Sequence, residues 1–526
     1  MKVLSSAAMK EADRKTIEEL GMPGAVLMET AAIRVVELIR HKLPRARRFA
    51  ILAGPGNNGG DGLVVARLLK NAGLSGSLWS TVKPGGYRGD AGINEQYLER
   101  TSFRINRLGE RESLDQFREE LKSVDVVVDA LLGIGVGREV EGLFAELVEG
   151  INGSGRPVVA VDIPSGVNAD TGAVMGCAVQ ADWTVTFAFP KLGLLCYEGA
   201  EKAGEIYVGQ INIPPALVEN EPVDLLTPAR ILDLLPAREK SAHKGSLGRV
   251  LIVAGSPGMT GAAVMTAESA LRGGAGLAYL AVPHSLEPVV SAQLVEVITL
   301  SLEEAQPGIL GPAAAETIVD RAGACEALAV GPGLDPGSDT AAVLEKVIVS
   351  SPVPVVIDAG ALEALKGRMD LLKQAKTPVV ITPHPGEMAR LSGLSVREVQ
   401  ENRLEVALDY ARRWGVFLLL KGYNTIIAAP DGKAAINPTG GPALATAGSG
   451  DLLTGLIASF MAQGLEAEDA ARAGAFMHGL SGDLVPGGRG HMARDVMSYY
   501  KQAFHKLENA EASREVNPYL TGIGFY

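Results

Sequence analysis

The sequence is poor in cysteine and has no excess of basic residues. Its three cysteines, Cys177, Cys196 and Cys325, include no CxxC pair, which argues against a disulfide framework and against a zinc site. The formal net charge of −12 argues against a surface for nucleic acid or an anionic membrane, because both need clustered Lys and Arg. We therefore expect no nucleic-acid partner and no membrane partner.

Long apolar runs are also missing. No stretch approaches the ~20 uncharged apolar residues that a membrane span needs. Residues 1–21 mix acidic and basic side chains in an amphipathic pattern, which differs from the apolar core of a signal peptide. We expect a cytoplasmic protein whose opening segment is a helix of the mature chain.

The chain is rich in short β-branched runs that alternate with helical segments. Its 526 residues exceed one ordinary core, since domains usually run about 100 to 250 residues. The alternation predicts the α/β class, with a helix-covered parallel sheet in each half. The predicted strands are 49–54, 124–130, 157–163 and 182–188 in the first half, and 249–255, 276–282, 354–360, 378–384 and 416–422 in the second.

A proline-rich segment separates the two series of strands. Residues 211–230 contain four prolines and several acidic residues, as is typical of a linker. We expect a first domain at 1–224, a second at 225–507, and a tail at 508–526, where no hydrophobic period continues.

A glycine-rich stretch, AGPGNNGGDG at 53–62, follows the first predicted strand. Its five glycines let the backbone approach a ligand, and the following helix presents unpaired N–H groups to an anion. The stretch is neither a Walker loop nor a GxGxxG fingerprint. A phosphate or dinucleotide cradle and a tight turn without a ligand are therefore both open interpretations.

Polar side chains follow the other strands of the first half. Because the carboxyl ends of parallel strands share one edge, we expect convergence there of Asn57, Asn58, Asp61, Asp129, Asp162 and Ser165. The oxygen-rich set Asn58, Asp129 and Ser165 would suit an alkali or alkaline-earth cation, although turn-capping residues give the same pattern. The glycines at 133, 135 and 137 are typical of a flexible turn as well as of a nucleotide-binding loop.

The motifs GPGNNGGDG, VDALLGIG and VDIPSGVNADTG, in this order after the opening helix, resemble the NAD(P)H-hydrate epimerase family. The resemblance implies a Rossmann-like three-layer domain, a potassium ion at Asn58, Asp129 and Ser165, and Asp162 as the acid–base residue at the hydrated nicotinamide. The implied substrate contacts are Asn57, Asn58, Gly59, Gly60, Asp61, Gly133, Ile134, Gly135, Val136, Gly137, Arg138, Glu139 and Asp162.

In the second half, TAGSGDLLTG at 446–455 precedes an apolar helical stripe. The glycines free the backbone for an anion hole at the helix start. Asp451 in the first turn could accept the proton of a hydroxyl that attacks a phosphoryl group, or merely complement the helix dipole. Lys421 and Thr425 lie upstream, and this combination resembles the ribokinase-like three-layer fold.

Further motifs, HKGSLGRVLIVAGSPGMTGAA, AVGPGLDP, VVIDAGAL and ITPHPGEMARL, resemble the ADP-dependent NAD(P)H-hydrate dehydratases. The resemblance covers nearly all of 228–500 and implies ADP as phosphoryl donor, with magnesium. His384 between two prolines is also typical of a shaped turn without a ligand. The implied substrate contacts are Ala262, Gly333, His384 and Asp451, and the implied nucleotide contacts are Lys421, Gly422, Tyr423, Asn424, Thr425 and Gly450.

Together the resemblances imply a bifunctional metabolite-repair enzyme, an isomerase that epimerises the R and S hydrates NADHX and NADPHX and a lyase that dehydrates the S epimer with ADP. We also expect a homo-oligomer. Two alternatives stay open: a small-molecule kinase of the ribokinase type fused to a Rossmann-like regulator, and an N-terminal half that binds without catalysis.

Overall fold

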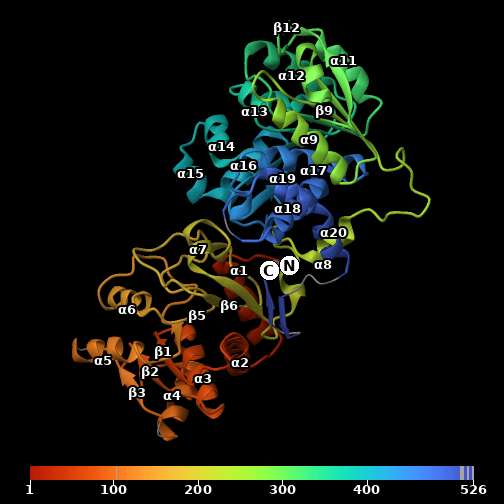
Figure 1. The fold of residues 1–526 in the computed structure, drawn as a ribbon. Coiled ribbons are helices and arrows are strands. Elements are labelled where there is room, and N and C mark those ends of the chain that lie inside the picture. The colour runs from red at the N-terminus through yellow and green to blue at the C-terminus, as the bar shows by residue number, and fades with distance from the viewer. Residues whose placement is uncertain (102, 110, 488, 510–513, 518–519, 524–526) are drawn as a thin grey trace. The chain divides into compact units, whose positions relative to one another are not determined.

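The computed structural model describes residues 1–101, 103–109, 111–487, 489–509, 514–517 and 520–523, which form two compact units (Figure 1). Unit 1 begins at Met1, ends its main part at Glu221 and includes the last two strands of the chain, whereas unit 2 begins at Pro222. Residues 510–513, 518–519 and 524–526 of the predicted tail lie outside the described residues. No described helix is long and apolar enough to cross a membrane.

Unit 1 is built on a sheet in the order β20-β21-β7-β6-β5-β4-β1-β2-β3. All pairs among β1 to β7 are parallel, as the alternating pattern predicts. The strands are β1 (Arg48–Ala53), β2 (Ser75–Ser80), β3 (Ile105–Arg107), β4 (Val126–Ala130), β5 (Val158–Val161), β6 (Trp183–Phe187), β7 (Glu205–Gly209), β20 (Arg514–Asn517) and β21 (Leu520–Gly522).

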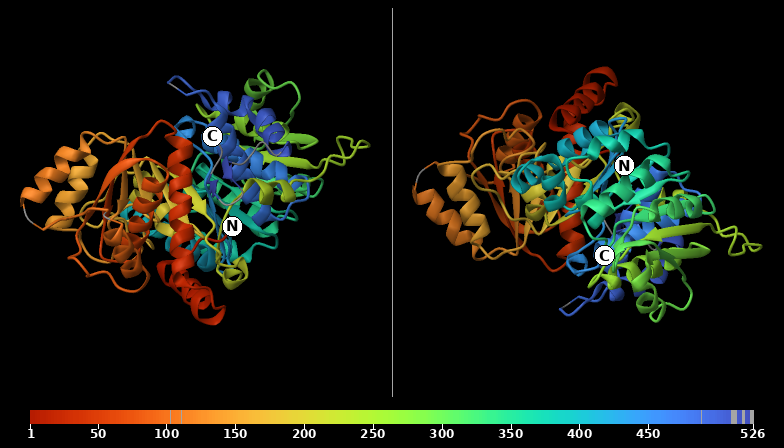
Figure 2. Two further views of the ribbon diagram at one scale, coloured as in Figure 1. Left: turned by 90° about the horizontal axis from the view of Figure 1, so that it is seen from below. Right: turned by 90° about the horizontal axis from the view of Figure 1, so that it is seen from above.

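Helices cover both faces of this sheet, so that unit 1 has three layers. One core joins α2, α3 and α4 to the sheet, and a second core joins α5 and α6 to its opposite face, on the far side of the strands from α2 in Figure 2. The predicted opening helix ends as a π-helical turn at Lys15–Glu19. The helices are α1 (Ser6–Arg14), α2 (Gly24–Lys42), α3 (Asn57–Asn71), α4 (Gly89–Arg100), α5 (Arg111–Leu121), α6 (Leu143–Asn152) and α7 (Tyr197–Lys202).

Unit 2 is built on a larger sheet in the order β11-β10-β9-β14-β15-β16-β17-β18-β19-β8. The pairs from β11 to β17 are parallel, whereas β17, β18 and β19 pair antiparallel. The strands are β8 (Val223–Leu225), β9 (Arg249–Val253), β10 (Leu277–Pro283), β11 (Ile298–Leu302), β14 (Ala327–Val330), β15 (Val355–Ile357), β16 (Val379–Ile381), β17 (Phe417–Leu420), β18 (Thr425–Ala428) and β19 (Ala434–Asn437), with β12 (Glu304–Gln306) and β13 (Ile309–Leu310) as a separate pair.

One core of unit 2 lies between its sheet and the apolar face of α17, which packs beside α9 and α18. This confirms the buried apolar stripe predicted after residue 451. The helices are α8 (Pro228–Leu234), α9 (Thr260–Arg272), α10 (Glu287–Ser291), α11 (Ala314–Ala322), α12 (Ser338–Ser350), α13 (Gly360–Ala364), α14 (Pro385–Ser392), α15 (Val396–Glu401), α16 (Arg403–Trp414), α17 (Ser449–Ala462), α18 (Ala467–Leu484), α19 (Ala493–Ser498) and α20 (Tyr500–Glu508).

Short strands occur in both segments where the pattern predicts a linker or a tail. β8 lies within 211–230 and pairs with β19, and β21 pairs antiparallel with β7, with Leu520 fully buried. A strand of three residues is too short to show a hydrophobic period, so the sequence pattern contains no sign of either strand.

Candidate active sites

Unit 1 contains a cavity of about 800 Å³ at the carboxyl ends of its parallel strands. Of the site residues predicted in this unit, Gly59, Gly60, Asp129 and Ser165 are not among those that line it. The predicted residues that line the cavity are Asn57, Asn58, Asp61, Gly133, Ile134, Gly135, Val136, Gly137, Arg138, Glu139 and Asp162.

The glycine-rich stretch differs from the expected loop, because α3 already begins at Asn57. The space around Gly59 and Gly60 explains the difference. A Cβ on Gly59 would lie 1.9 Å from the Gly54 carbonyl oxygen, and a Cβ on Gly60 would lie 2.6 Å from Met28 Cε. These two glycines let the start of α3 pack closely against Gly54 and Met28. The side chains of this helix turn that line the cavity are therefore Asn57, Asn58 and Asp61.

Asp162 follows β5 directly and lies in the left-handed region, with φ of 66°, which few non-glycine residues adopt. Its Oδ1 accepts hydrogen bonds from the Thr186 hydroxyl at 3.2 Å, from the Phe187 N–H at 3.1 Å and from the Lys191 ammonium. Lys191 has a side chain that is only 1% exposed. The sequence analysis did not predict Lys191 as a site residue. Its position shortly after the carboxyl end of β6 would have indicated that it lies at the ligand-binding edge of the sheet.

The three residues of the implied cation set meet around the Leu132 peptide. The Ser165 hydroxyl donates to Asp129 Oδ1 at 2.6 Å and the Leu132 N–H donates to Ser165 Oγ at 2.8 Å, while the Asn58 amide donates to the Leu132 carbonyl at 3.0 Å. Burial raises the pKa of Asp129 to about 6, although hydrogen bonds from Ser165 and Leu131 oppose the shift.

The buried side-chain oxygen of Asn58 indicates whether Asn58, Asp129 and Ser165 could bind a cation. Asn58 Oδ1 is buried and finds no hydrogen-bond partner among the described residues. Together with the buried Asp129 carboxyl and the Ser165 hydroxyl, it forms a set of hard oxygen donors without nitrogen or sulfur, which is the chemistry of an alkali cation. The residues therefore fit the potassium ion that the epimerase resemblance implies.

In unit 2, Asp451 lies in the first turn of α17, directly after Gly448 and Gly450. Gly448 has φ of 89°, which favours glycine, and it starts the helix. Burial and the negative charges of Asp358 and Glu387 raise the pKa of Asp451 to about 7, against the opposing charge of Lys421. A carboxyl with this pKa can both take and return a proton near neutral pH.

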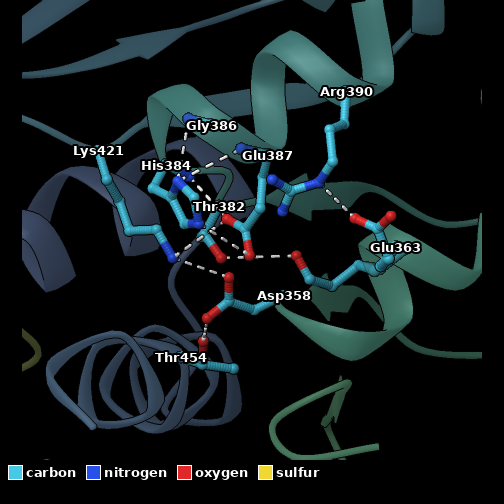
Figure 3. A network of polar contacts seen from close by, with 10 residues as sticks. Asp358, Glu363, Thr382, His384, Gly386, Glu387, Arg390, Lys421 and Thr454 are labelled. Carbon is cyan, nitrogen blue, oxygen red and sulfur yellow. Dashed lines mark hydrogen bonds and ion pairs between the residues drawn. The ribbon is translucent and has the colours of Figure 1, made fainter. Parts of the chain in front are cut away.

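A buried ion-pair network lies beside the start of α17 (Figure 3). Lys421 Nζ donates to Asp358 Oδ1 at 3.0 Å and lies 3.8 Å from Glu387 Oε2, and the Thr454 hydroxyl donates to Asp358 Oδ2 at 2.8 Å. A Cβ on Gly450 would lie 3.2 Å from Lys421 Nζ, so glycine at this position leaves room for the ammonium. Sequence reasoning missed Asp358, although it follows the buried strand β15 directly.

His384 has the role of a helix cap in this structure (Figure 3). Its Nδ1 accepts hydrogen bonds from the N–H groups of Gly386 and Glu387 at 3.0 and 3.3 Å, while Glu387 Oε2 accepts from the His384 N–H at 2.7 Å. Because Nδ1 accepts, the ring carries its proton on Nε2 when it is neutral. The half-exposed ring can therefore cap α14 and still offer Nε2–H to a ligand.

Arg403 shapes the turn from Lys421 to Thr425, whose residues are the implied nucleotide contacts. Its guanidinium, in a residue only 3% exposed, donates to the carbonyls of Leu420, Lys421 and Asn424. Asn424 is buried, whereas Tyr423 is exposed. The buried Arg403 guanidinium therefore fixes the backbone of the turn, while the exposed side of the turn stays accessible to a ligand.

Ala262 and Gly333, two of the implied substrate contacts, lie side by side. A Cβ on Gly333 would lie 3.0 Å from the Ala262 Cβ and 2.6 Å from the Met259 carbonyl oxygen. Both positions require small residues, because the chain segments approach closely here.

Two family models match the chain. One, described as YjeF-related protein N-terminus, matches residues 24–193, and the other, described as NAD(P)H-hydrate dehydratase, matches residues 250–502. The chain is 43% identical to the bifunctional NAD(P)H-hydrate repair enzyme Nnr of Moorella thermoacetica, over 97% of each chain. It is 39% identical to that of Thermofilum pendens, over 96% of this chain and 97% of the relative. The ADP/ATP-dependent NAD(P)H-hydrate dehydratase structure of Bacillus subtilis, co-crystallised with ATP/Mg²⁺, is 29% identical and covers 55% of this chain and 99% of that one, with a TM-score of 0.48.

Proposed function

Because this chain belongs to the family of bifunctional NAD(P)H-hydrate repair enzymes, we propose that it restores hydrated NADH and NADPH in two steps. Unit 1 interconverts the R and S hydrates, and unit 2 dehydrates the S hydrate with ADP as the phosphoryl donor. The observation that carries the dehydration step is the half-buried Asp451 carboxyl at the glycine-opened start of α17, in the electrostatic field of the Lys421–Asp358 pair.

The dehydration step needs a better leaving group than hydroxide. Water has a pKa of ~15.7, whereas the second ionisation of a phosphate ester has a pKa of ~6. Transfer of the β-phosphoryl group of ADP to the substrate hydroxyl therefore makes its departure much easier, and AMP is left. Asp451 takes the hydroxyl proton and returns it to the departing phosphate, while the ring nitrogen helps to expel that phosphate. The iminium that results loses a proton from the adjacent ring carbon to water, which restores the reduced nicotinamide ring.

The residues around Asp451 have supporting roles in this proposal. Lys421 and the turn up to Thr425 bind the nucleotide phosphates, and the N–H groups at the start of α17 hold the transferred phosphoryl group. Magnesium would neutralise charge on the phosphates. Asp358 and Glu387 keep Lys421 charged: although burial opposes the charged form, these carboxylates raise the pKa of Lys421.

The epimerisation step is assigned to Asp162 in the cavity of unit 1. Its Oδ1 is occupied by three donors, so Oδ2 is the oxygen that can act on the substrate hydroxyl. Asn58, Asp129 and Ser165 would hold potassium, which supplies a fixed positive charge beside the bound substrate. Such a partner activity gives the stereospecific dehydratase access to both hydrates.

A coupled assay tests the proposed function. Incubation of the protein with a mixture of R and S hydrates and ADP should restore the near-ultraviolet absorbance of the reduced dinucleotide completely. A kinase of the ribokinase type would instead leave a stable phosphorylated hydrate and no gain in absorbance. That result would refute the dehydration step.

The dehydration rate should depend on pH through Asp451. The base must be ionised, and its pKa is about 7, so kcat/KM for dehydration should rise through pH 7 and level off above it. Glu387→Gln removes a negative charge that raises this pKa, so the rise should occur at lower pH in that variant. A flat profile between pH 6 and 8, or an unshifted profile in Glu387→Gln, would contradict the role of Asp451.

Removal of potassium should affect unit 1 alone. When choline replaces potassium, epimerisation should fall several-fold while dehydration of the S hydrate is unchanged. Potassium should also raise the thermal unfolding midpoint of the wild-type protein, because a bound ion stabilises the folded state, but not that of Asn58→Leu. Asn71→Leu, at an exposed position of the same helix, serves as the matched control. Equal potassium responses in the two variants would refute the site.

We further propose that the enzyme works in the cytoplasm as a homo-oligomer. The three cysteines are free and two of them are buried, which suits a reducing compartment. Light scattering of the purified protein tests the oligomeric state.

A further inference from the structure

Asp61 and Asp162 line the same cavity, but their carboxyls differ in the hydrogen bonds that they accept. Asp162 Oδ1 accepts hydrogen bonds from three groups, one of which is the Lys191 ammonium. Asp61 also lines the cavity and is only 9% exposed, yet no described residue donates a hydrogen bond to its carboxyl. A carboxylate needs donors when it is buried, whereas a protonated carboxyl does not need them.

Lys191 has no hydrogen bond left for a ligand. An ammonium carries three N–H donors, and Lys191 Nζ donates to Asp162 Oδ1, to the Thr186 hydroxyl at 3.0 Å and to the Phe187 carbonyl at 3.1 Å. All three partners belong to the β5 and β6 strand ends. Lys191 therefore acts on Asp162 and not on the substrate, and its ammonium fixes the position of the Asp162 carboxyl.

Asp61 is surrounded by negative charge. Burial, and then the charges of Asp162 and Asp13, raise the pKa of Asp61 well above its ordinary value, and Lys191 only partly opposes this shift. Asp13, on α1, also has a raised pKa, because of burial and the charge of Asp162. The other charged side chains that line the cavity are Lys10, Asp90, Arg138, Glu139 and Glu141.

We propose that Asp61 is the general acid of the epimerisation and that Asp162 is its base. Lys191 and Asp13 are positioning residues: Lys191 donates a hydrogen bond to Asp162, and the negative charge of Asp13 favours the protonated form of Asp61. This inference rests on the proposed epimerisation in unit 1. A pair of carboxyls whose environments differ in this way is the usual arrangement for acid and base roles in one site.

The chemistry of the hydrate requires both roles. Its hydroxyl is on the ring carbon next to the ring nitrogen. Asp162 takes the hydroxyl proton, the carbon–oxygen bond becomes a carbonyl, and the carbon–nitrogen bond breaks with its electron pair moving to nitrogen. Asp61 gives its proton to that nitrogen. After rotation about the adjacent carbon–carbon bond, the nitrogen attacks the other face of the carbonyl, Asp61 regains its proton and Asp162 returns the hydroxyl proton.

Asp61→Asn tests the acid role, since asparagine keeps the size but cannot give a proton. We expect epimerisation to fall about 100-fold, the lower end of the range for general acid–base catalysis. Dehydration of the S hydrate by the same chain should be unchanged. Asp115→Asn, at an exposed position of α5, is the matched control and should epimerise at the wild-type rate.

Asp13→Asn provides a second test with a readout that a structural role would not move. The epimerisation rate of the wild type should fall at high pH, where Asp61 loses its proton. Removal of the Asp13 charge lowers the pKa of Asp61, so this fall should occur at lower pH in the variant.

Epimerisation by Asp61→Asn within threefold of wild type, or an unshifted fall in Asp13→Asn, would overturn the inference while the proposed function stands. Absence of epimerisation in the unsubstituted protein would refute the proposed function itself.

Discussion

Asp451→Asn should abolish the ADP-dependent recovery of the reduced dinucleotide and leave epimerisation intact. Asparagine has nearly the same size and can still lie at the start of α17, but it cannot take the hydroxyl proton. Loss of a general base costs about 10²- to 10⁴-fold in rate, and we expect the upper part of this range because Asp451 acts twice, in phosphoryl transfer and in elimination.

The measurement is single-turnover dehydration of the purified S hydrate, with ADP binding followed by calorimetry. Epimerisation in the same sample reports whether unit 1 is folded, and preserved ADP affinity reports the same for unit 2. Asp409→Asn, at an exposed position of α16, is the matched control and should dehydrate at the wild-type rate. Recovery at more than about a tenth of the wild-type rate in Asp451→Asn would contradict the base role.

Asp162→Ala should abolish epimerisation and leave dehydration of the S hydrate unchanged. In this proposal the Asp162 carboxyl takes the substrate hydroxyl proton, so we expect a loss of about 10³-fold or more. In an assay with mixed hydrates and ADP, only the S fraction should be converted, and the R fraction should persist.

Stability complicates this variant, because Asp162→Ala leaves the buried Lys191 ammonium without its ion partner. Removal of one member of a buried pair typically costs about 3–5 kcal/mol. The double variant Asp162→Asn with Lys191→Met removes the stranded charge, so it should unfold at a higher temperature than Asp162→Ala and still not epimerise. Equal loss of both activities in the stable double variant would refute the division of labour between the two units.

Several features of the fold follow from patterns that are local in the chain. The β-branched runs predict the parallel strands, since such side chains fill a sheet that is covered on both faces. The strand ends and the glycine-rich stretches direct attention to Asp162, Asp129 and Asp451. The short strands β8 and β21 escape prediction, because each pairs with a strand that is distant in the chain, and their own composition does not indicate this pairing.

The sequence alone thus determined the α/β class, the two successive sheets and the family motifs, because hydrophobic period and turn composition act over a few neighbouring residues. Only the tertiary structure decided which side chains meet. Lys191 reaches Asp162 because β5 and β6 are neighbours in the sheet, and Lys421 reaches Asp358 across β16, which separates β15 from β17. Strand order and burial determine these ion pairs and the pKa of Asp451. Neither strand order nor burial can be read from a local stretch of residues.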